Sequence, residues 1–124
     1  MQLTKNFSIH EFDCKDGTKV PKEFYKNVKE LAENLQVLRD YIKESVMITG
    51  SGYRTPSHNA KVGGAKNSQH LTASGADINA KNYTPRKLAG VIEKLIKEGK
   101  MKEGGIGVYK DFVHYDIRGT KARW

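Results

Sequence analysis

The apolar positions in the first third of the chain predict one helical turn and then a long helix. Ser8–Glu11 has the spacing of a capping box, which predicts a short turn that ends near Gly17. From Pro21 to about Ser45, apolar residues recur at steps of three and four: Phe24, Val28, Leu31, Leu35, Leu38 and Ile42. This spacing places them on one face of an amphipathic helix, and we expect that face to lie in the core.

The rest of the chain alternates between short strand patterns and helix patterns. The apolar run Val46–Ser51 predicts a buried strand that ends at Gly52. Thr55-Pro56 begins a short helix that extends to about Val62, and Thr84-Pro85 begins a helix that stops at Gly99, since threonine caps and proline fits the first helical position. Three further runs predict strands, and the last two form a hairpin around Lys110-Asp111: Ile78–Ala80, Gly105–Tyr109 and Phe112–Ile117.

The order of these elements indicates the fold class. Helices and strands are mixed without a regular βαβ alternation, which favours an α+β fold with a small, mainly antiparallel sheet and helices packed on one side. A chain of 124 residues can bury a modest core. No internal repeat or linker divides it, so we expect residues 1–124 to form a single domain.

Charge and composition narrow the range of partners. The net charge of +8 favours a polyanionic partner: nucleic acid, anionic lipid or the carboxylate-rich bacterial wall. The lysines are spread through the predicted helices and do not cluster with aromatic residues on one sheet face, which argues against nucleic acid. We expect no membrane span, because no apolar run approaches the roughly 20 residues of a transmembrane helix. We also expect a monomer.

The N-terminus carries an expectation about location. Met1–Asn6 lacks the apolar segment of a signal peptide, so we expect a protein made in the cytoplasm. If it acts on the cell wall, release by a holin, by lysis or with a phage particle would bring it there.

Candidate chemistry lies in His70, Asp77 and His114. Two neutral imidazoles and one carboxylate suit a tetrahedral Zn²⁺ whose fourth position is left for water. A closed structural zinc site is disfavoured because Cys14 is the only cysteine. Small residues separate the first two candidate ligands, and Asp77 and His114 both fall at predicted strands, which hold ligands more rigidly than loops do.

Several motifs together resemble a known family. The run Ser68-Gln69-His70, followed by Asp77 and by a later His114 on a strand, is similar to the zinc D-Ala-D-Ala carboxypeptidase group of peptidases, the M15 family. Further runs share this similarity, which covers nearly the whole chain: Phe7–Gly17, Ser51–Asn59, Gly63-Gly64 and Gly105–Tyr109. The resemblance implies a zinc D-Ala-D-Ala carboxypeptidase-like fold and a zinc peptidase that acts on peptidoglycan stem peptides.

The resemblance also implies roles for individual residues. His70, Asp77 and His114 would bind zinc, and Arg54 would bind the substrate or the transition state. The family places a general base three positions before the last histidine, where this chain has Asp111, one methylene shorter than glutamate. Asp116 is the rival, because it shares a strand face with His114 and is suited either to act as the base or to orient an imidazole.

The bond and the class of activity stay open at this point. The cleaved bond would be the terminal D-Ala-D-Ala bond, a cross-link or the L-Ala-D-Glu bond. An alternative function is a non-catalytic, zinc-bearing module that binds the cell wall. A nucleic-acid-binding domain is a third class, and it predicts steeply salt-dependent binding without metal.

Overall fold

A four-stranded sheet forms the centre of the computed structural model, which describes residues 1–124. Its strands are β1 (Gly75–Ile78), β2 (Gly105–Val108), β3 (Val113–Asp116) and β4 (Ala122–Arg123), in the spatial order β1-β3-β2-β4. β3 is antiparallel to both β1 and β2, and β4 is parallel to β2. The predicted α+β fold with a mainly antiparallel sheet is confirmed.

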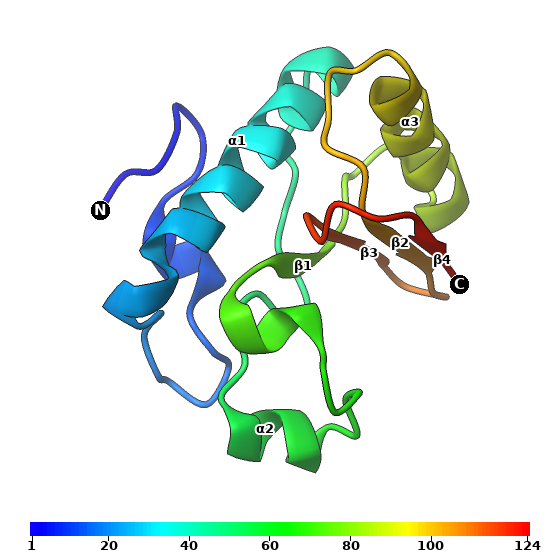
Figure 1. Cartoon of the computed structure of the whole chain (residues 1–124). Coiled ribbons are helices and arrows are strands. Elements are labelled where there is room, and N and C mark those ends of the chain that lie inside the picture. The colour runs from blue at the N-terminus through cyan, green and yellow to red at the C-terminus, as the bar shows by residue number, and fades with distance from the viewer.

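Three α-helices and three short 3₁₀ helices surround this sheet. The α-helices are α1 (Tyr25–Ile42), α2 (Pro56–Lys61) and α3 (Pro85–Lys97); the 3₁₀ helices are Ile9–Phe12, Lys22–Phe24 and Gln69–Thr72. α3 packs on β2 and β3, and α1 packs on α3. Figure 1 shows α1 and α3 together at one end of the molecule and α2 at the opposite end.

The predicted apolar stripe of α1 lies in the core. Val28, Leu31, Leu35 and Leu38 have no exposed surface. They belong to one cluster with side chains of α3 and of the sheet, including Ile92, Leu95, Ile78, Val113 and Tyr115. Each large side chain buried in this way contributes about 1.5–3 kcal/mol of hydrophobic free energy, so this cluster holds the helices on the sheet.

The starts of α2 and α3 follow from their capping residues. Thr55 Oγ1 accepts a hydrogen bond from the His58 amide at 3.1 Å, and Thr84 Oγ1 accepts one from the Lys87 amide at 3.2 Å. A proline occupies the first turn of both helices. The predicted starts are therefore confirmed, because each cap satisfies an amide that has no partner within the helix.

Two predicted elements have other bounds in the structure. The strand predicted at Ile78–Ala80 lies earlier, as β1 (Gly75–Ile78). The long helix predicted from Pro21 begins at Tyr25, after the 3₁₀ helix Lys22–Phe24.

Two further local predictions need correction. Val46–Ser51 is not a regular strand. It pairs with the chain beside it at an isolated bridge, Met47 to Asn79, but farther along Gly50 and Ser51 both bond the main chain of Asp77, which interrupts the register. The first helical turn ends at Phe12 instead of near Gly17, since the backbone is already extended at Asp13, with ψ 148°. Gly17, with φ +96°, belongs to a separate tight turn. The short strand β4 is not predicted, because its two residues show no strand pattern and become a strand only by pairing with β2.

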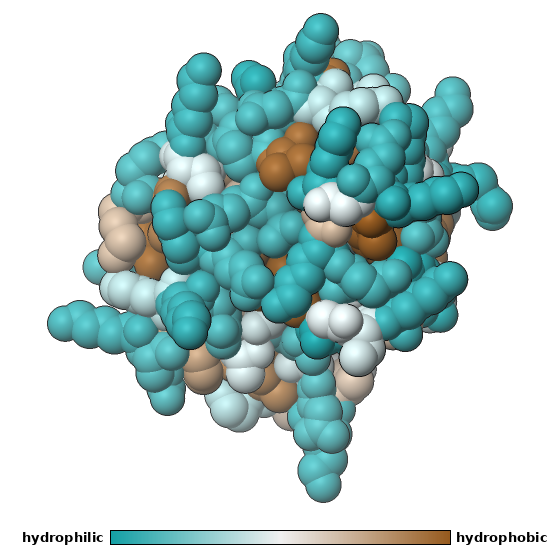
Figure 2. Space-filling model, turned by 45° about the horizontal axis from the view of Figure 1, so that its top comes forward, coloured by the Kyte–Doolittle hydropathy of each residue, from teal (hydrophilic) through white to brown (hydrophobic).

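The surface is mainly hydrophilic. Figure 2 shows one face on which polar residues dominate and apolar residues form small, separate patches. No helix in the structure combines the length and the apolar character that crossing a membrane requires.

The end of α1 gives a test of the backbone. Lys43 lies just beyond Ile42 with φ 58°, a left-handed conformation that a side chain disfavours and glycine accepts. We expect Lys43→Gly to raise the free energy of unfolding by roughly 0.5–1 kcal/mol in urea denaturation. Glu33→Gly, on the exposed middle of the same helix, is the control and should lower it by about 1 kcal/mol. Equal losses from both changes would contradict the left-handed C-cap.

Candidate active site and metal centre

The alternation of β1 and β3 sorts their side chains onto two faces of the sheet. Ala76 and Ile78 of β1 pair with Tyr115 and Val113 of β3, and all four lie in the core. Because successive side chains point to opposite faces, the residues between them face the other way. The register pairs Asp77 with His114 and Gly75 with Asp116. The chain thereby gathers its buried polar side chains on the face opposite the core.

His70 reaches the same place from a short 3₁₀ helix. Ser68 caps this helix, and its Oγ accepts a hydrogen bond from the His70 amide at 3.2 Å. Ala73 then takes a left-handed conformation with φ 57°, which turns the chain directly into β1. His70 and Asp77 are thus brought together by one tight connection.

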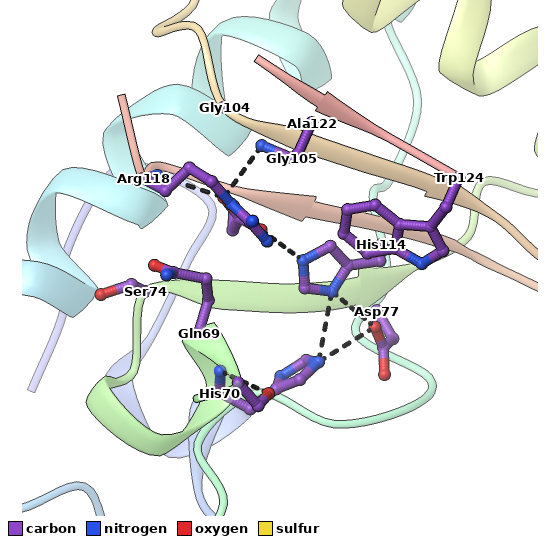
Figure 3. Close-up of polar contacts among 12 residues, drawn as sticks. Gln69, His70, Ser74, Asp77, Gly104, Gly105, His114, Arg118, Ala122 and Trp124 are labelled. Atoms are coloured by element: carbon purple, nitrogen blue, oxygen red, sulfur yellow. Dashed lines mark hydrogen bonds and ion pairs between the residues drawn. The ribbon is translucent and has the colours of Figure 1, made fainter. Parts of the chain in front are cut away.

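The three candidate ligand atoms form a nearly equilateral triangle. His70 Nε2 lies 3.3 Å from both Asp77 Oδ1 and His114 Nδ1, and His114 Nδ1 lies 3.2 Å from Asp77 Oδ1 (Figure 3). Ligand atoms at zinc–nitrogen and zinc–oxygen distances of about 2.0–2.1 Å on a tetrahedron lie roughly 3.3 Å apart. All three residues are at least 95% buried. The donor set and its spacing therefore fit a zinc ion with one position left open.

The outer nitrogen of each imidazole has its own acceptor. His70 Nδ1 lies 2.7 Å from the Gly52 carbonyl, and His114 Nε2 lies 2.7 Å from Asp116 Oδ2. A carbonyl or carboxylate oxygen accepts, so each outer nitrogen carries the hydrogen and each inner nitrogen keeps its lone pair. Burial alone would lower the pKa of His114, but Asp116 and Asp77 raise it above its usual value. A proton therefore competes with a metal for this histidine at low pH.

Asp116 is completely buried and held on several sides. Arg118 donates to both of its oxygens, from Nε to Oδ1 at 2.9 Å and from Nη2 to Oδ2 at 2.8 Å. The Gly105 amide donates to Oδ1 at 2.9 Å, where a Cβ on that glycine would come within 2.3 Å of Oδ2. Burial raises the pKa of Asp116, but hydrogen bonds from His114, Arg118 and Gly105 outweigh it and hold the pKa below its usual range. Asp116 is thus an ionised acceptor that orients His114.

Arg54 lies beside Asp77, the carboxylate among the three candidate ligands. Its Nη2 is 3.6 Å from Asp77 Oδ2. Its Nε donates to Ser51 Oγ at 2.8 Å, and its Nη1 donates to Asn59 Oδ1 at 3.1 Å. Because a guanidinium has five N–H donors, these two bonds fix its orientation and leave other donors available.

A cleft of about 670 Å³ opens over these groups. Residues 62–68, between α2 and the 3₁₀ helix Gln69–Thr72, line part of it, and Tyr109, Phe112 and Trp124 line another part. Arg54, Lys66 and Arg118 contribute positive charge along the cleft. The three candidate ligands are thus accessible to a substrate although they are nearly buried.

The structure brings together five of the six candidate residues that the sequence predicts and leaves the sixth apart. His70, Asp77, His114, Arg54 and Asp116 lie together, whereas Asp111 is an exposed residue of the turn between β2 and β3 and does not line the cleft. Arg118 is a residue that the sequence analysis missed, although its position two residues after Asp116 was a usable signal. Trp124 reaches the site only through the tertiary fold, so no local pattern marks it. Asn59 belongs to the run Ser51–Asn59, but its hydrogen bond with Arg54 appears only in the structure.

A second cluster brings together Cys14, Asp16 and His58. Asp16 is exposed, and its oxygens already accept hydrogen bonds from the Thr18 amide at 2.9 Å and from Thr55 Oγ1 at 2.9 Å. Its hydrogen bonds, above all that from Thr18, lower the pKa of Asp16 below its usual range. This cluster therefore ties the loop before α1 to the start of α2, and its carboxylate is already engaged.

Comparison with known proteins agrees with the geometry. The model of the family described as Peptidase M15 matches residues 4–116, which include the candidate ligands, Arg54 and Asp116. No curated protein matches the sequence significantly. Since the family match covers most of its length, the chain belongs to the M15 peptidase family.

Proposed function

We propose that this M15 peptidase is a zinc enzyme that hydrolyses a peptide bond in peptidoglycan stem peptides. The triangle of ligand atoms at 3.2–3.3 Å carries the zinc assignment, with His70, Asp77 and His114 as the ligands. The stem-peptide substrate is supported by the similarity of the motifs to the D-Ala-D-Ala carboxypeptidase group and by the positive charge of the cleft. Hydrolysis of the terminal D-Ala-D-Ala bond, of a cross-link or of the L-Ala-D-Glu bond is consistent with these features.

Each side chain of the site has a part in this reaction. When bound, zinc supplies a Lewis acid that polarises a carbonyl group and makes water a stronger nucleophile at neutral pH. Arg54 binds a substrate carboxylate or stabilises the negative charge that develops on the carbonyl oxygen, because a planar guanidinium suits both. Its bonds to Ser51 and Asn59 hold it in orientation before the substrate arrives.

The proton transfers need a carboxylate that is not already engaged. Both oxygens of Asp116 are occupied by His114, Arg118 and the Gly105 amide, so its part is to hold the His114 ring. Asp111 is the general base in this proposal: it accepts a proton from the attacking water and returns it to the leaving amine. Asp111 does not itself line the cleft, but it is exposed and directly precedes Phe112, which does.

A non-catalytic, zinc-bearing wall-binding module is the second candidate. The position of Asp111 outside the lining of the cleft favours it. The two functions differ in a direct way, because only the enzyme releases new amino groups from a stem peptide and loses this activity with a chelator.

Removal of one ligand tests the metal assignment. We expect about one zinc per chain in the wild type by elemental analysis, and His70→Ala should lose both the zinc and the hydrolysis of stem peptides. Zinc should also raise the melting temperature of the wild type but not that of His70→Ala, because only a folded site binds the ion. His10→Ala, an exposed histidine outside the cleft, is the control and should behave as the wild type. Full zinc occupancy in His70→Ala would show that the metal binds at another site.

Replacement of Arg54 separates substrate binding from metal binding. Arg54→Ala should keep its zinc but lose on the order of 10²-fold in kcat/KM, as for a lost oxyanion donor. Arg54→Lys should recover only part of this loss, since an ammonium group does not reproduce the planar fork. Arg86→Ala, an exposed arginine of α3, is the control. Near-normal kinetics in Arg54→Ala would leave the arginine with a structural part only.

Two asparagine variants separate the base from the residue that orients the histidine. Asp111→Asn should lower kcat by roughly 10²–10⁴-fold with zinc affinity nearly intact. Asp116→Asn should instead weaken zinc binding by roughly 10–100-fold, because the His114 ring loses its charged acceptor. Kinetics and competitive zinc titration measure both effects. A fully active Asp111→Asn together with an inactive, zinc-loaded Asp116→Asn would reverse the two roles.

A further inference from the structure

Trp124 is held rigidly beside a candidate metal ligand. Its amide donates to the Ile106 carbonyl at 3.1 Å, and its carbonyl accepts from the Val108 amide at 2.9 Å. Its indole Nε1 donates to Tyr109 Oη at 2.6 Å. The indole ring lies 5.1 Å from the His114 ring, centre to centre, and Figure 3 shows the two next to each other. Main-chain and side-chain bonds together fix this ring.

Strand β2 makes room for the indole. Gly107 is the cross-strand partner of His114, and a Cβ on Gly107 would come within 2.4 Å of Trp124 Nε1. Any larger residue at this position would displace the ring, since the contact is with a held side chain. The glycine therefore lets Trp124 lie against the sheet next to His114.

The fixed ring nevertheless remains about half exposed. Trp124 has 49% of its surface exposed and lines the cleft, as do Tyr109, with 43% exposed, and Phe112. Tyr109 and Phe112 stack with their ring centres 4.5 Å apart. We call Tyr109, Phe112 and Trp124 the aromatic wall. A preorganised, exposed aromatic surface inside a cleft offers apolar area to a ligand at a small cost in conformational entropy.

The charges of the cleft leave the wall with a distinct role. Arg54 lies next to Asp77, and the Arg118 guanidinium lies 5.5 Å from the Trp124 ring centre while it donates to Asp116. The wall itself carries no formally charged side chain. A substrate held across His70, Asp77 and His114 would therefore meet polar groups at its peptide bond and apolar surface beside that bond.

We propose that the aromatic wall, and Trp124 above all, binds the small non-polar side chain of the residue next to the cleaved bond. This proposal rests on the proposed function, and it names the substrate feature that the site selects. The terminal D-Ala-D-Ala bond and the L-Ala-D-Glu bond both have an alanine next to the cleaved bond, and the wall offers apolar surface to its methyl group.

The test measures the coupling between the wall and that methyl group. Stem peptides with alanine next to the cleaved bond are compared with analogues that have glycine there. The wild type should prefer alanine by roughly 10-fold in kcat/KM. Trp124→Ala should reduce this preference to near one, whereas Trp124→Phe should keep most of it, because phenylalanine retains apolar area. Tyr41→Ala, an exposed aromatic residue of α1 outside the cleft, should preserve the wild-type preference.

Zinc content and melting temperature of each variant show whether the fold and the metal site are retained. An undiminished alanine preference in folded, zinc-loaded Trp124→Ala would overturn the proposed role of the aromatic wall. So would an equal loss on both peptides accompanied by weaker zinc binding, since Trp124 would then only support His114.

Binding separates this inference from the proposed function. Trp124 is the only tryptophan, so its fluorescence reports directly on a ligand in the cleft. If the wild type hydrolyses no stem peptide, the proposed function fails. In that case, the peptide concentration needed to change the fluorescence is compared for the two peptides. A lower concentration for the alanine peptide still supports binding of the methyl group by the aromatic wall, and equal concentrations overturn it.

Discussion

The pairing of Asp77 with His114 across β1 and β3 is the constraint on which the site depends. Directly opposite residues of antiparallel strands have side chains close together on one face, so the register of this pair fixes the distance between carboxylate and imidazole. A slip of β1 by one residue against β3 would turn Asp77 into the core and bring Ala76 to the cleft, while His114 kept its place. The buried apolar partners on the opposite face resist that slip. The same packing that stabilises the fold thus positions the chemistry.

A chain of hydrogen bonds extends this constraint from the ligands outward. Arg118 holds Asp116, Asp116 holds His114, and the Gly52 carbonyl holds His70. Every buried side-chain nitrogen and oxygen in the structure has a hydrogen-bond partner. A network that is satisfied in this way keeps each ring in one tautomer and one orientation, which a metal ligand requires. Two glycines of β2 leave room for this network, since a side chain at Gly105 would collide with Asp116 and one at Gly107 would collide with Trp124.

Sequence reasoning predicts the parts of this structure that local chemistry controls. The apolar stripe of α1, the threonine caps of α2 and α3, and the hairpin of β2 and β3 each depend on residues close in sequence, and all are confirmed. The prediction of a regular strand at Val46–Ser51 was wrong because Gly50 and Ser51 both bond the main chain of Asp77, a local offset that no sequence pattern marks. Trp124 acquires its part through contacts with Tyr109 and Gly107, which only the assembled sheet brings together. The contact of Arg118 with Asp116 is local, two residues apart, and was missed although the sequence carried it. The assignment of Asp111 as the base stays a prediction.

X-ray absorption at the zinc edge of the metal-loaded protein tests the central claim most directly, because it reports the atoms bound to the ion. The account predicts nitrogen and oxygen neighbours at about 2.0–2.1 Å, with the scattering signature of two imidazole rings and no sulfur. A sulfur neighbour at about 2.3 Å would place the ion with Cys14, the only cysteine of the chain. That result, or the absence of imidazole scattering, would contradict a zinc centre built by His70, Asp77 and His114.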